Sequence, residues 1–337
     1  MSSPSTNPPL PSPPFHTIPN IANLRDPTLY LLHTPTGPLR SSILFRSADV
    51  SKLTRPYCQL LRALGIAHVF DLRSLPEVTR GMAALINDSA ADVKAGWMEA
   101  LSGAGIERSW VPVFSEKDYS PEGMAARYVK YMDEDVKGFV DAYADILRSG
   151  GSAYGRIFRY LANLSEEEVG SGKVGAMVHC TAGKDRTGMF FGILFEFLGV
   201  ERSSIAAEYN LTEMGLRHVR DEIVGRLMQS PAFKAYMASR AAGKALTNEE
   251  LSNIIADEKS GGAEEGAEIP AEVVEVGRRA AVRMVGARKE SMIGALEMLD
   301  REFGGAEKYM RDVCGLSGEE MERLRRNLVI GEGDGKA

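Results

Sequence analysis

The chain has 337 residues, 44% of them hydrophobic and 26% charged, which is an ordinary composition for a globular protein with a substantial core. Its formal net charge of −6 argues against a general nucleic-acid binder, which needs a basic footprint, but it allows a local phosphate pocket. The cysteines Cys58, Cys180 and Cys314 have neither metal-ligand nor disulfide spacing, and the five histidines form no H-x3-H pair. We therefore predict no metal, no other cofactor and a reducing compartment.

Both ends of the chain differ in composition from the part between them. Residues 1–19 are rich in proline and serine, which predicts a disordered tail, and we expect a second disordered tail at 331–337. The amino terminus lacks the charged start and apolar core of a signal peptide, and no apolar run is long enough to cross a bilayer. These features predict a cytoplasmic or nucleocytoplasmic protein with a single domain over residues 20–330.

The first half of this domain alternates strands with helices. We expect a strand at 43–45, a helix at 54–65 and a second strand at 66–72, and such a unit predicts parallel pairing with a right-handed crossover. A further strand is expected at 110–114, followed by helical periodicity over 120–147. The pattern predicts an α/β fold with a central, largely parallel sheet flanked by helices.

The carboxyl-terminal part is predicted to be helical. Thr247–Glu250 and Ser317–Glu320 have the spacing of capping boxes, and the charged, glycine-rich stretch 257–269 predicts a mobile loop within a helical insertion at about 213–290. Five basic residues of the insertion predict a solvated helix face, with weak contact to anionic lipid headgroups as the alternative: Arg278, Arg279, Arg283, Arg288 and Lys289.

One stretch carries the residues of a chemical site. An apolar run at 174–178 ends at His179 and Cys180, a polar turn follows, and an apolar helix begins at about Met189. The start of a helix presents unpaired N–H groups and the positive end of the helix dipole, so a loop placed there can wrap an anion. Cys180 lies at the floor of such a cradle, and Arg186, whose planar fork suits phosphate, lies at its rim. This cationic setting favours a nucleophilic thiolate.

The string HCTAGKDRTG resembles the signature loop of cysteine-dependent tyrosine phosphatases, and its AGKDRTG form resembles the atypical tyrosine-phosphatase-like family of bacteria and fungi. Further resembling pieces are spread over most of the chain: 23–26, 45–48, 70–74 and 208–212. The resemblance implies a protein-tyrosine phosphatase, a phosphoric monoester hydrolase whose substrates are phosphotyrosine proteins, with dual specificity and phosphoinositides in some members. It also implies that the helical carboxyl-terminal part acts as a lid in some members. No nucleic acid and no obligate protein partner are expected.

The resemblance assigns roles to the loop. Cys180 attacks the phosphomonoester and forms a cysteinyl-phosphate, while the loop holds the phosphate oxygens. The expected phosphate-binding residues are Thr181, Ala182, Gly183, Lys184, Asp185 and Arg186. Asp185 is the first choice for the general acid and base, with a structural carboxylate as its alternative. Asp71 is second, with an ion pair to Arg73 or a turn cap as its alternative, and Asp118 is third, with a solvated turn as its alternative.

Other residues near the loop have supporting roles. Lys184 is expected to add positive charge at the pocket mouth, which in similar phosphatases accompanies phosphoinositide activity, and a surface lysine is the alternative. His179 is expected to orient the loop, and Thr187 to donate a hydrogen bond to the sulfur. Asp71 and Arg46, at the ends of predicted strands, are expected to support the same pocket because ligands gather at the carboxyl ends of parallel strands.

Two other functions stay open at this point. A module that keeps the cradle but lacks an effective acid would bind phosphorylated ligands without turnover. Sulfur transfer from a persulfide on the cysteine, as in rhodanese-like proteins, is disfavoured by Lys184, Asp185 and Thr187. Turnover of an aryl phosphate distinguishes the phosphatase from both.

Overall fold

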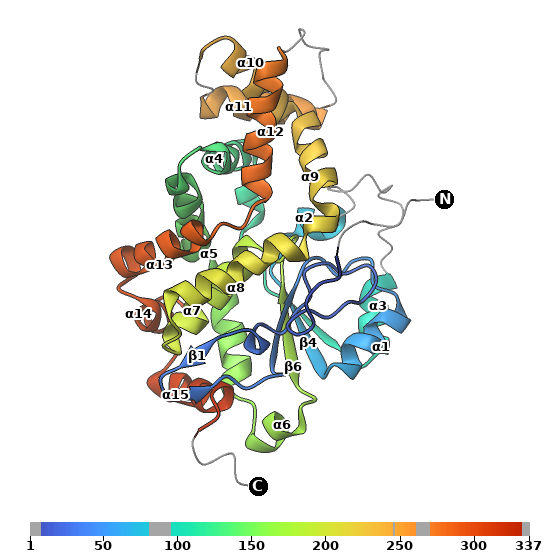
Figure 1. Ribbon diagram of the computed structural model, residues 1–337, viewed down its shortest axis with the longest axis vertical. Helices are drawn as coiled ribbons and strands as arrows, with labels where there is room; N and C mark the ends of the chain where they lie inside the picture. Colours follow the sequence, from blue (N-terminus) through green and yellow to red (C-terminus); the bar gives the residue numbers. More distant parts are fainter. Residues whose placement is uncertain (1–7, 81–95, 245–246, 261–269, 332–337) are drawn as a thin grey trace.

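A parallel sheet forms the centre of the protein (Figure 1). The computed structural model describes residues 8–80, 96–244, 247–260 and 270–331. Within them, four strands pair in the order β3-β6-β4-β5, with the bounds β3 Leu44–Ser47, β6 Gly175–His179, β4 Ile66–Asp71 and β5 Glu107–Trp110. A small antiparallel hairpin joins β1 His33–Thr34 to β2 Gly37–Pro38. The predicted α/β fold with a largely parallel sheet is confirmed.

Helices cover both faces of the sheet (Figure 1). Met177 packs in one apolar cluster with residues of α1 (Arg55–Ala63) and α3 (Gly96–Gly103). Its neighbour Val178 packs in another cluster with α5 (Val136–Ala162) and α7 (Asp185–Phe197). Successive side chains of a strand point to opposite faces, so the two clusters lie on opposite sides of the sheet. This arrangement buries every residue of β6.

The remaining helices extend the fold away from the sheet. They are the 3-10 helices η1 Pro27–Leu29 and η4 Glu116–Tyr119, and the α-helices α2 Leu75–Arg80, α4 Pro121–Met132, α6 Glu166–Ser171, α8 Arg202–Gly215, α9 Arg217–Gln229, α10 Pro231–Ala241, α11 Asn248–Ser260, α12 Ala271–Val285, α13 Lys289–Phe303, α14 Ala306–Asp312 and α15 Gly318–Leu328. Helices α4, α9, α10, α11 and α12 share an apolar cluster of their own, at the top of Figure 1. No helix of the described residues is both long and apolar enough to cross a membrane.

The carboxyl ends of the four strands lie level with one another. Ser47 pairs with His179, His179 pairs with Asp71, and Asp71 pairs with Trp110. Residues that follow these positions therefore meet at one edge of the sheet. Cys180 comes directly after His179, so the strand register alone places the cysteine beside the ends of β3 and β4.

Two predicted elements have the wrong bounds. The strand expected at 110–114 overlaps β5 only at Trp110, where β5 ends, although Val111 and Val113 beyond it still donate to the carbonyls of Asp71 and Leu72. The helical stretch expected over 120–147 is two helices, α4 and α5, and α5 continues to Ala162. Asp133 and Asp135 separate them, since each carboxylate accepts a backbone N–H two residues further on, at 3.0 and 2.9 Å. Such side-chain bonds compete with a continuous helix.

The amino-terminal tail is more structured than its composition suggests. Phe15 is fully buried, the guanidinium carbon of Arg25 lies 5.5 Å from the centre of its ring, and Ile18 is buried nearby. The prediction of disorder over 1–19 is therefore wrong for its second half, because two apolar side chains find core positions among the prolines. Residues 1–7 lie outside the described residues.

In the carboxyl-terminal part, the predicted capping boxes are present, and the predicted loop has different bounds. Both capping boxes are confirmed: Thr247 and Glu250 bond each other's backbone N–H at the start of α11, and Ser317 and Glu320 do so at the start of α15. The loop predicted at 257–269 begins later, because α11 continues to Ser260. Residues 261–269, and 332–337 of the predicted tail, lie outside the described residues.

Candidate active site

The loop between β6 and α7 has the shape of a cradle. Cys180 follows the last residue of the strand and is 3% exposed, and α7 begins at Asp185. Gly183 has φ +64°, and a Cβ at this position would lie 2.2 Å from the carbonyl oxygen of Ser47. Glycine adopts this backbone conformation without strain, and no side chain fits in the space. The loop can therefore pass closely over the end of β3.

Hydrogen bonds to the carbonyl groups of the loop set its orientation. Asn23 Nδ2 donates to the carbonyls of Ala182 and Gly183 at 3.1 and 3.2 Å, and Arg46 Nη2 donates to the latter at 2.8 Å. The backbone N–H of Asp49 donates to the carbonyl of Thr181 at 3.0 Å. Three successive carbonyls thus point into the protein. No described residue accepts a bond from the N–H groups of Thr181, Ala182 or Gly183, which leaves them for an anion.

A buried charge network lies beneath the loop. Glu208, on α8, accepts from Arg25 Nε and from Arg46 Nη1, both at 2.7 Å, and all three side chains are at most 2% exposed. Burial alone would raise the pKa of Glu208, but the two guanidiniums hold it below its usual range. Arg46, predicted as a supporting residue, therefore acts on the loop from below by fixing the Gly183 carbonyl.

Arg186 is held by a residue outside the set predicted from the sequence. Its Nη1 and Nη2 donate to the two carboxylate oxygens of Glu77, on α2, each at 2.6 Å. No described residue accepts from Nε of Arg186. Burial would lower the pKa of Arg186, but nearby Glu77, Tyr119 and Cys180 raise it well above its usual range. The arginine is thus permanently charged, oriented and electrostatically close to the cysteine.

Glu77 also reaches the loop directly. It accepts from Thr181 Oγ1 at 2.6 Å, from Tyr119 OH at 2.5 Å, and from the backbone N–H and hydroxyl of Ser74 at 3.0 Å. Burial would raise the pKa of Glu77, but Arg186 and the hydroxyls of Thr181 and Tyr119 hold it well below its usual range. The feature of the sequence that could have indicated a role for Glu77 is its S-x-x-E spacing from Ser74, which is typical of a capping box.

Asp71 lies among cations. Its carboxylate accepts from Arg73 Nε at 2.9 Å and Nη2 at 2.8 Å, and from Arg108 Nη2 at 2.8 Å. Burial would raise the pKa of Asp71, but His179 and the two arginines hold it well below its usual range. A carboxylate with such partners keeps no proton to donate at neutral pH. The geometry therefore matches the ion-pair alternative for Asp71 rather than acid catalysis.

His179 connects this ion pair to the cysteine. Its Nε2 lies 3.6 Å from Asp71 Oδ1, and its Nδ1 lies 3.1 Å from the carbonyl oxygen of Cys180. Burial lowers the pKa of His179, and the negative charge of Asp71 opposes this shift. Because a carbonyl oxygen can only accept, Nδ1 donates to it, and the ring orients the backbone at Cys180.

Asp185 is the acidic residue carried by the loop. Its side chain is 24% exposed, and its Oδ1 accepts from Tyr143 OH at 3.0 Å. The hydroxyls of Tyr143 and Tyr209 are 2.5 Å apart, and burial raises the pKa of both phenols, so they stay protonated. Asp185 is thus positioned at the mouth of the cradle by a chain of two buried tyrosines.

The other predicted residues take different positions. Lys184 is 4% exposed, and its Nζ donates to the carbonyls of Met284 and Gly286 at 2.5 and 3.1 Å, so it faces the end of α12. Thr187 Oγ1 is buried, and no described residue is its hydrogen-bond partner. Asp118 caps η4 by accepting the backbone N–H of Ser115 at 2.7 Å.

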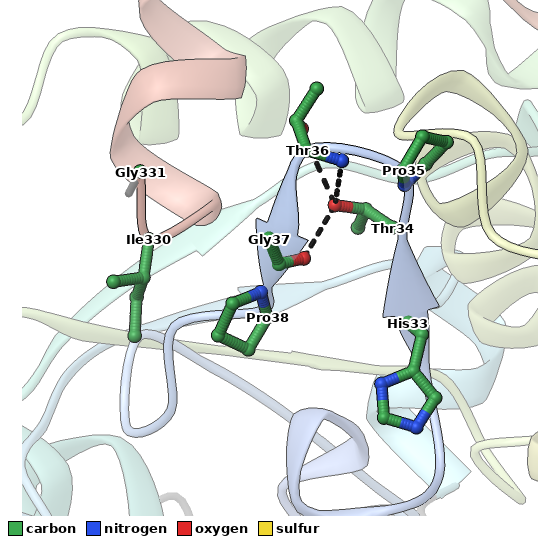
Figure 2. Close-up of a pocket in the computed structure, with 8 residues that line it drawn as sticks. All are labelled: His33, Thr34, Pro35, Thr36, Gly37, Pro38, Ile330 and Gly331. Atoms are coloured by element: carbon green, nitrogen blue, oxygen red, sulfur yellow. Dashed lines mark hydrogen bonds between the residues drawn. The ribbon is translucent and has the colours of Figure 1, made fainter. Parts of the chain in front are cut away.

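A separate cavity lies on the β1–β2 hairpin, away from the cysteine. Its volume is about 880 Å³, and Figure 2 shows its lining: His33, Thr34, Pro35, Thr36, Gly37, Pro38, Ile330 and Gly331. Thr34 Oγ1 donates to the carbonyl of Gly37 at 2.6 Å and closes the turn. His33 is the one ionisable side chain in this lining, so the cavity lacks the paired groups that catalysis requires.

Comparison with known proteins agrees with this geometry. The triple specificity protein phosphatase PtpB of Mycobacterium tuberculosis is 24% identical over 331 residues, which cover 93% of this chain and 98% of that protein. A tyrosine-protein phosphatase of Nostoc commune is 25% identical over 167 residues, which cover 50% of this chain and 47% of that protein. A model of the tyrosine phosphatase family matches residues 16–330, so the chain belongs to this family and is a cysteine-dependent phosphatase.

Proposed function

We propose that this phosphatase hydrolyses phosphotyrosine in proteins through a cysteinyl-phosphate intermediate. In the first step the Cys180 thiolate attacks phosphorus in line, and the bond from phosphorus to the phenolic oxygen breaks. The N–H groups of Thr181, Ala182 and Gly183 and the Nε edge of Arg186 hold the equatorial oxygens. Water then hydrolyses the phosphorus–sulfur bond, which releases phosphate and restores the thiolate.

The observation that carries this proposal is that some polar groups of the loop and of Arg186 bond the protein and the others are left for the phosphate. Its carbonyls are bonded to Asn23, Arg46 and Asp49, so its N–H groups are available to a phosphate. Arg186 is held through its two terminal nitrogens by Glu77. A cradle organised in advance of binding stabilises the charge of the transition state without reorganisation.

Asp185 is proposed as the acid that protonates the leaving oxygen and as the base that activates water. Its support is its place in the loop, its partial exposure and the bond from Tyr143. Asp71 is paired with Arg73 and Arg108, and Asp118 caps η4, so neither competes for this role.

The range of substrates is also a proposal. A relative that covers nearly the whole chain is named a triple specificity protein phosphatase, which supports activity beyond phosphotyrosine. We propose phosphoserine, phosphothreonine and phosphoinositides as the further substrates. We place the enzyme in a reducing compartment such as the cytoplasm, because oxidation of Cys180 to a sulfenic acid would stop the reaction.

Turnover of an aryl phosphate tests the proposal. We expect the wild type to release phosphate and Cys180→Ser to be inactive. Cys314→Ser is the matched control: burial raises the pKa of the Cys314 thiol to about 12, so this cysteine is no nucleophile and its variant keeps the wild-type rate. Binding of a phosphopeptide by the wild type without turnover would overturn the proposal in favour of a silent binding module.

A further inference from the structure

The turn between α12 and α13 is fastened to the active site from two sides. Nζ of Lys184, in the catalytic loop, donates to two carbonyls of this turn at 2.5 and 3.1 Å. From α8, Asn210 Nδ2 donates to the carbonyl of Ala287 at 2.8 Å, and Glu213 Oε1 accepts from its N–H at 2.6 Å. The position of the turn relative to the cradle is therefore fixed by four hydrogen bonds.

Two arginines flank this turn and have no counterion among the described residues. Arg283 lies in the last turn of α12, and Arg288 directly precedes α13. The Nε and Nη2 atoms of both are buried, and no described residue accepts a hydrogen bond from them or forms an ion pair with either side chain. By contrast, Arg278, further along α12, pairs with Glu275 at 3.0 Å. Buried cations without acceptors are costly, so an anionic ligand is the simplest explanation for the pair.

Arg288 is also close to the catalytic loop. Its guanidinium carbon lies 5.4 Å from the centre of the Phe139 ring, and Lys184 Nζ lies 5.3 Å from the same point. Lys184 has three donor hydrogens, and it faces two carbonyls and Asp185 Oδ1, the last at 3.4 Å. Its donors are thus engaged within the protein. Arg288 lies beside the same loop, and its Nε and Nη2 donors have no acceptor in the part of the chain that the structure describes.

We propose that Arg288 and Arg283 form a second anion-binding site, which takes acidic side chains next to the phosphorylated residue of a peptide substrate. This inference rests on the proposed phosphotyrosine phosphatase function and assigns a specificity to it. A guanidinium fork matches a carboxylate or a phosphate with two parallel hydrogen bonds. Arg283 and Arg288 lie at the two ends of one turn, and a peptide with several acidic side chains can supply a carboxylate to each of them.

Paired peptides test this site. One phosphotyrosyl peptide carries glutamate on both flanks, and the other carries glutamine. We expect the wild type at low salt to turn over the glutamate peptide with a kcat/KM roughly tenfold higher, about the effect of one charge-assisted hydrogen bond. In Arg288→Met and Arg283→Met this ratio should fall towards one. Lys289→Met, which removes the same charge from an exposed neighbour, should keep the wild-type ratio.

A melting curve separates a binding role from a structural one. Because the Arg283 guanidinium has no hydrogen-bond or ionic partner among the described residues to lose, Arg283→Met should have a Tm no lower than the wild type, whereas Arg288→Met also loses the contact with the Phe139 ring. A lower Tm in Arg283→Met would contradict the inference, since it would show that the arginine stabilises the fold.

Each kinetic outcome is decisive. If both peptides are hydrolysed and the ratio is unchanged in the arginine variants, the second site is wrong and the proposed function stands. If a soluble inositol bisphosphate loses turnover in these variants while the peptide ratio is unchanged, the site belongs to a headgroup and the peptide assignment is wrong. If the wild type hydrolyses neither peptide, the proposed function fails. Fluorescence anisotropy of the two labelled peptides on wild type and Arg288→Met then tests the site by binding alone.

Discussion

Arg186 and Glu77 meet fork to fork: each terminal nitrogen of the guanidinium lies 2.6 Å from one oxygen of the carboxylate, although the two residues are 109 positions apart in sequence. This pairing orients the arginine before any phosphate arrives. The same carboxylate receives the hydroxyl of Thr181 at 2.6 Å, so one side chain of α2 fixes both ends of the loop. Substitution of Glu77 should therefore damage catalysis without touching the nucleophile.

Glu77→Gln keeps the shape of the side chain and removes its charge. We expect kcat/KM on an aryl phosphate to fall roughly 10- to 100-fold, the effect of losing one or two charge-assisted hydrogen bonds that orient the arginine. Glu99→Gln, on the exposed side of α3, is the control and should retain full activity. An unchanged rate in Glu77→Gln would show that Arg186 needs no partner.

The Glu77 carboxylate also predicts a dependence of stability on pH. Its pKa in the folded protein is held well below the ordinary value of 4.5, so ionised Glu77 stabilises the fold at pH values above 4.5. That stabilisation is lost as the pH falls from 4.5 towards the lower folded value. The difference in Tm between wild type and Glu77→Gln should therefore be largest near neutral pH and shrink below about pH 4.5. A difference that grows on acidification would contradict the assignment.

Glu208→Ala should destabilise the whole protein. It leaves Arg25 and Arg46 buried without their shared counterion, and the loss of one partner from a buried ionic network costs about 3–5 kcal/mol. Thermal unfolding should show a Tm several degrees below that of the wild type. Glu167→Ala, at an exposed position on α6, should leave the Tm within about a degree.

Gly183→Ala should abolish activity through geometry. The new methyl group would lie 2.2 Å from the Ser47 carbonyl oxygen, at a backbone angle that only glycine adopts easily. Gly225→Ala, within helix α9, is a matched control because a methyl group there would meet no atom within 4 Å. This second change should be active and more stable by about 0.4–1 kcal/mol. Aryl phosphate turnover and thermal unfolding of both variants provide the comparison.

Tyr143→Phe removes the hydroxyl that holds Asp185. We expect kcat to fall several-fold with little change in KM, because the acid is then less well positioned for proton transfer while the phosphate cradle is intact. Tyr160→Phe removes a hydroxyl that donates to the Val174 carbonyl, outside the site, and should have wild-type kinetics. Equal losses in the two variants would argue that Asp185 needs no positioning by Tyr143.

The sequence predicted features that depend on neighbouring residues better than features that depend on distant ones. The strand, loop and helix around Cys180 follow from a short local pattern, and the structure has all three, although α7 begins at Asp185 rather than at about Met189. The capping boxes, which involve residues three apart, could be predicted from the sequence for the same reason. The break between α4 and α5 was missed because Asp133 and Asp135 are compatible with a helix until their side chains bond the backbone.

The surroundings of the loop could not be predicted in this way. Glu77 reaches Arg186 across 109 positions, and Lys184 turns towards a helix end 100 residues further along. Hydrogen bonding over such distances depends on how helices pack, which local periodicity does not describe. The roles of Cys180, Asp185 and Arg186 in catalysis stay predictions that the substitutions above address.

Asn23 and Arg25 impose a lower limit on the size of a working enzyme. Asn23 holds two carbonyls of the catalytic loop, and Arg25 completes the charge network below it. A fragment that begins at Ile43 would keep all four strands of the parallel sheet and the entire HCTAGKDRTG string, yet it would lack two of the residues that support the catalytic loop from below. Truncation from the amino terminus should thus eliminate activity once it passes Asn23, far ahead of the nucleophile in the sequence.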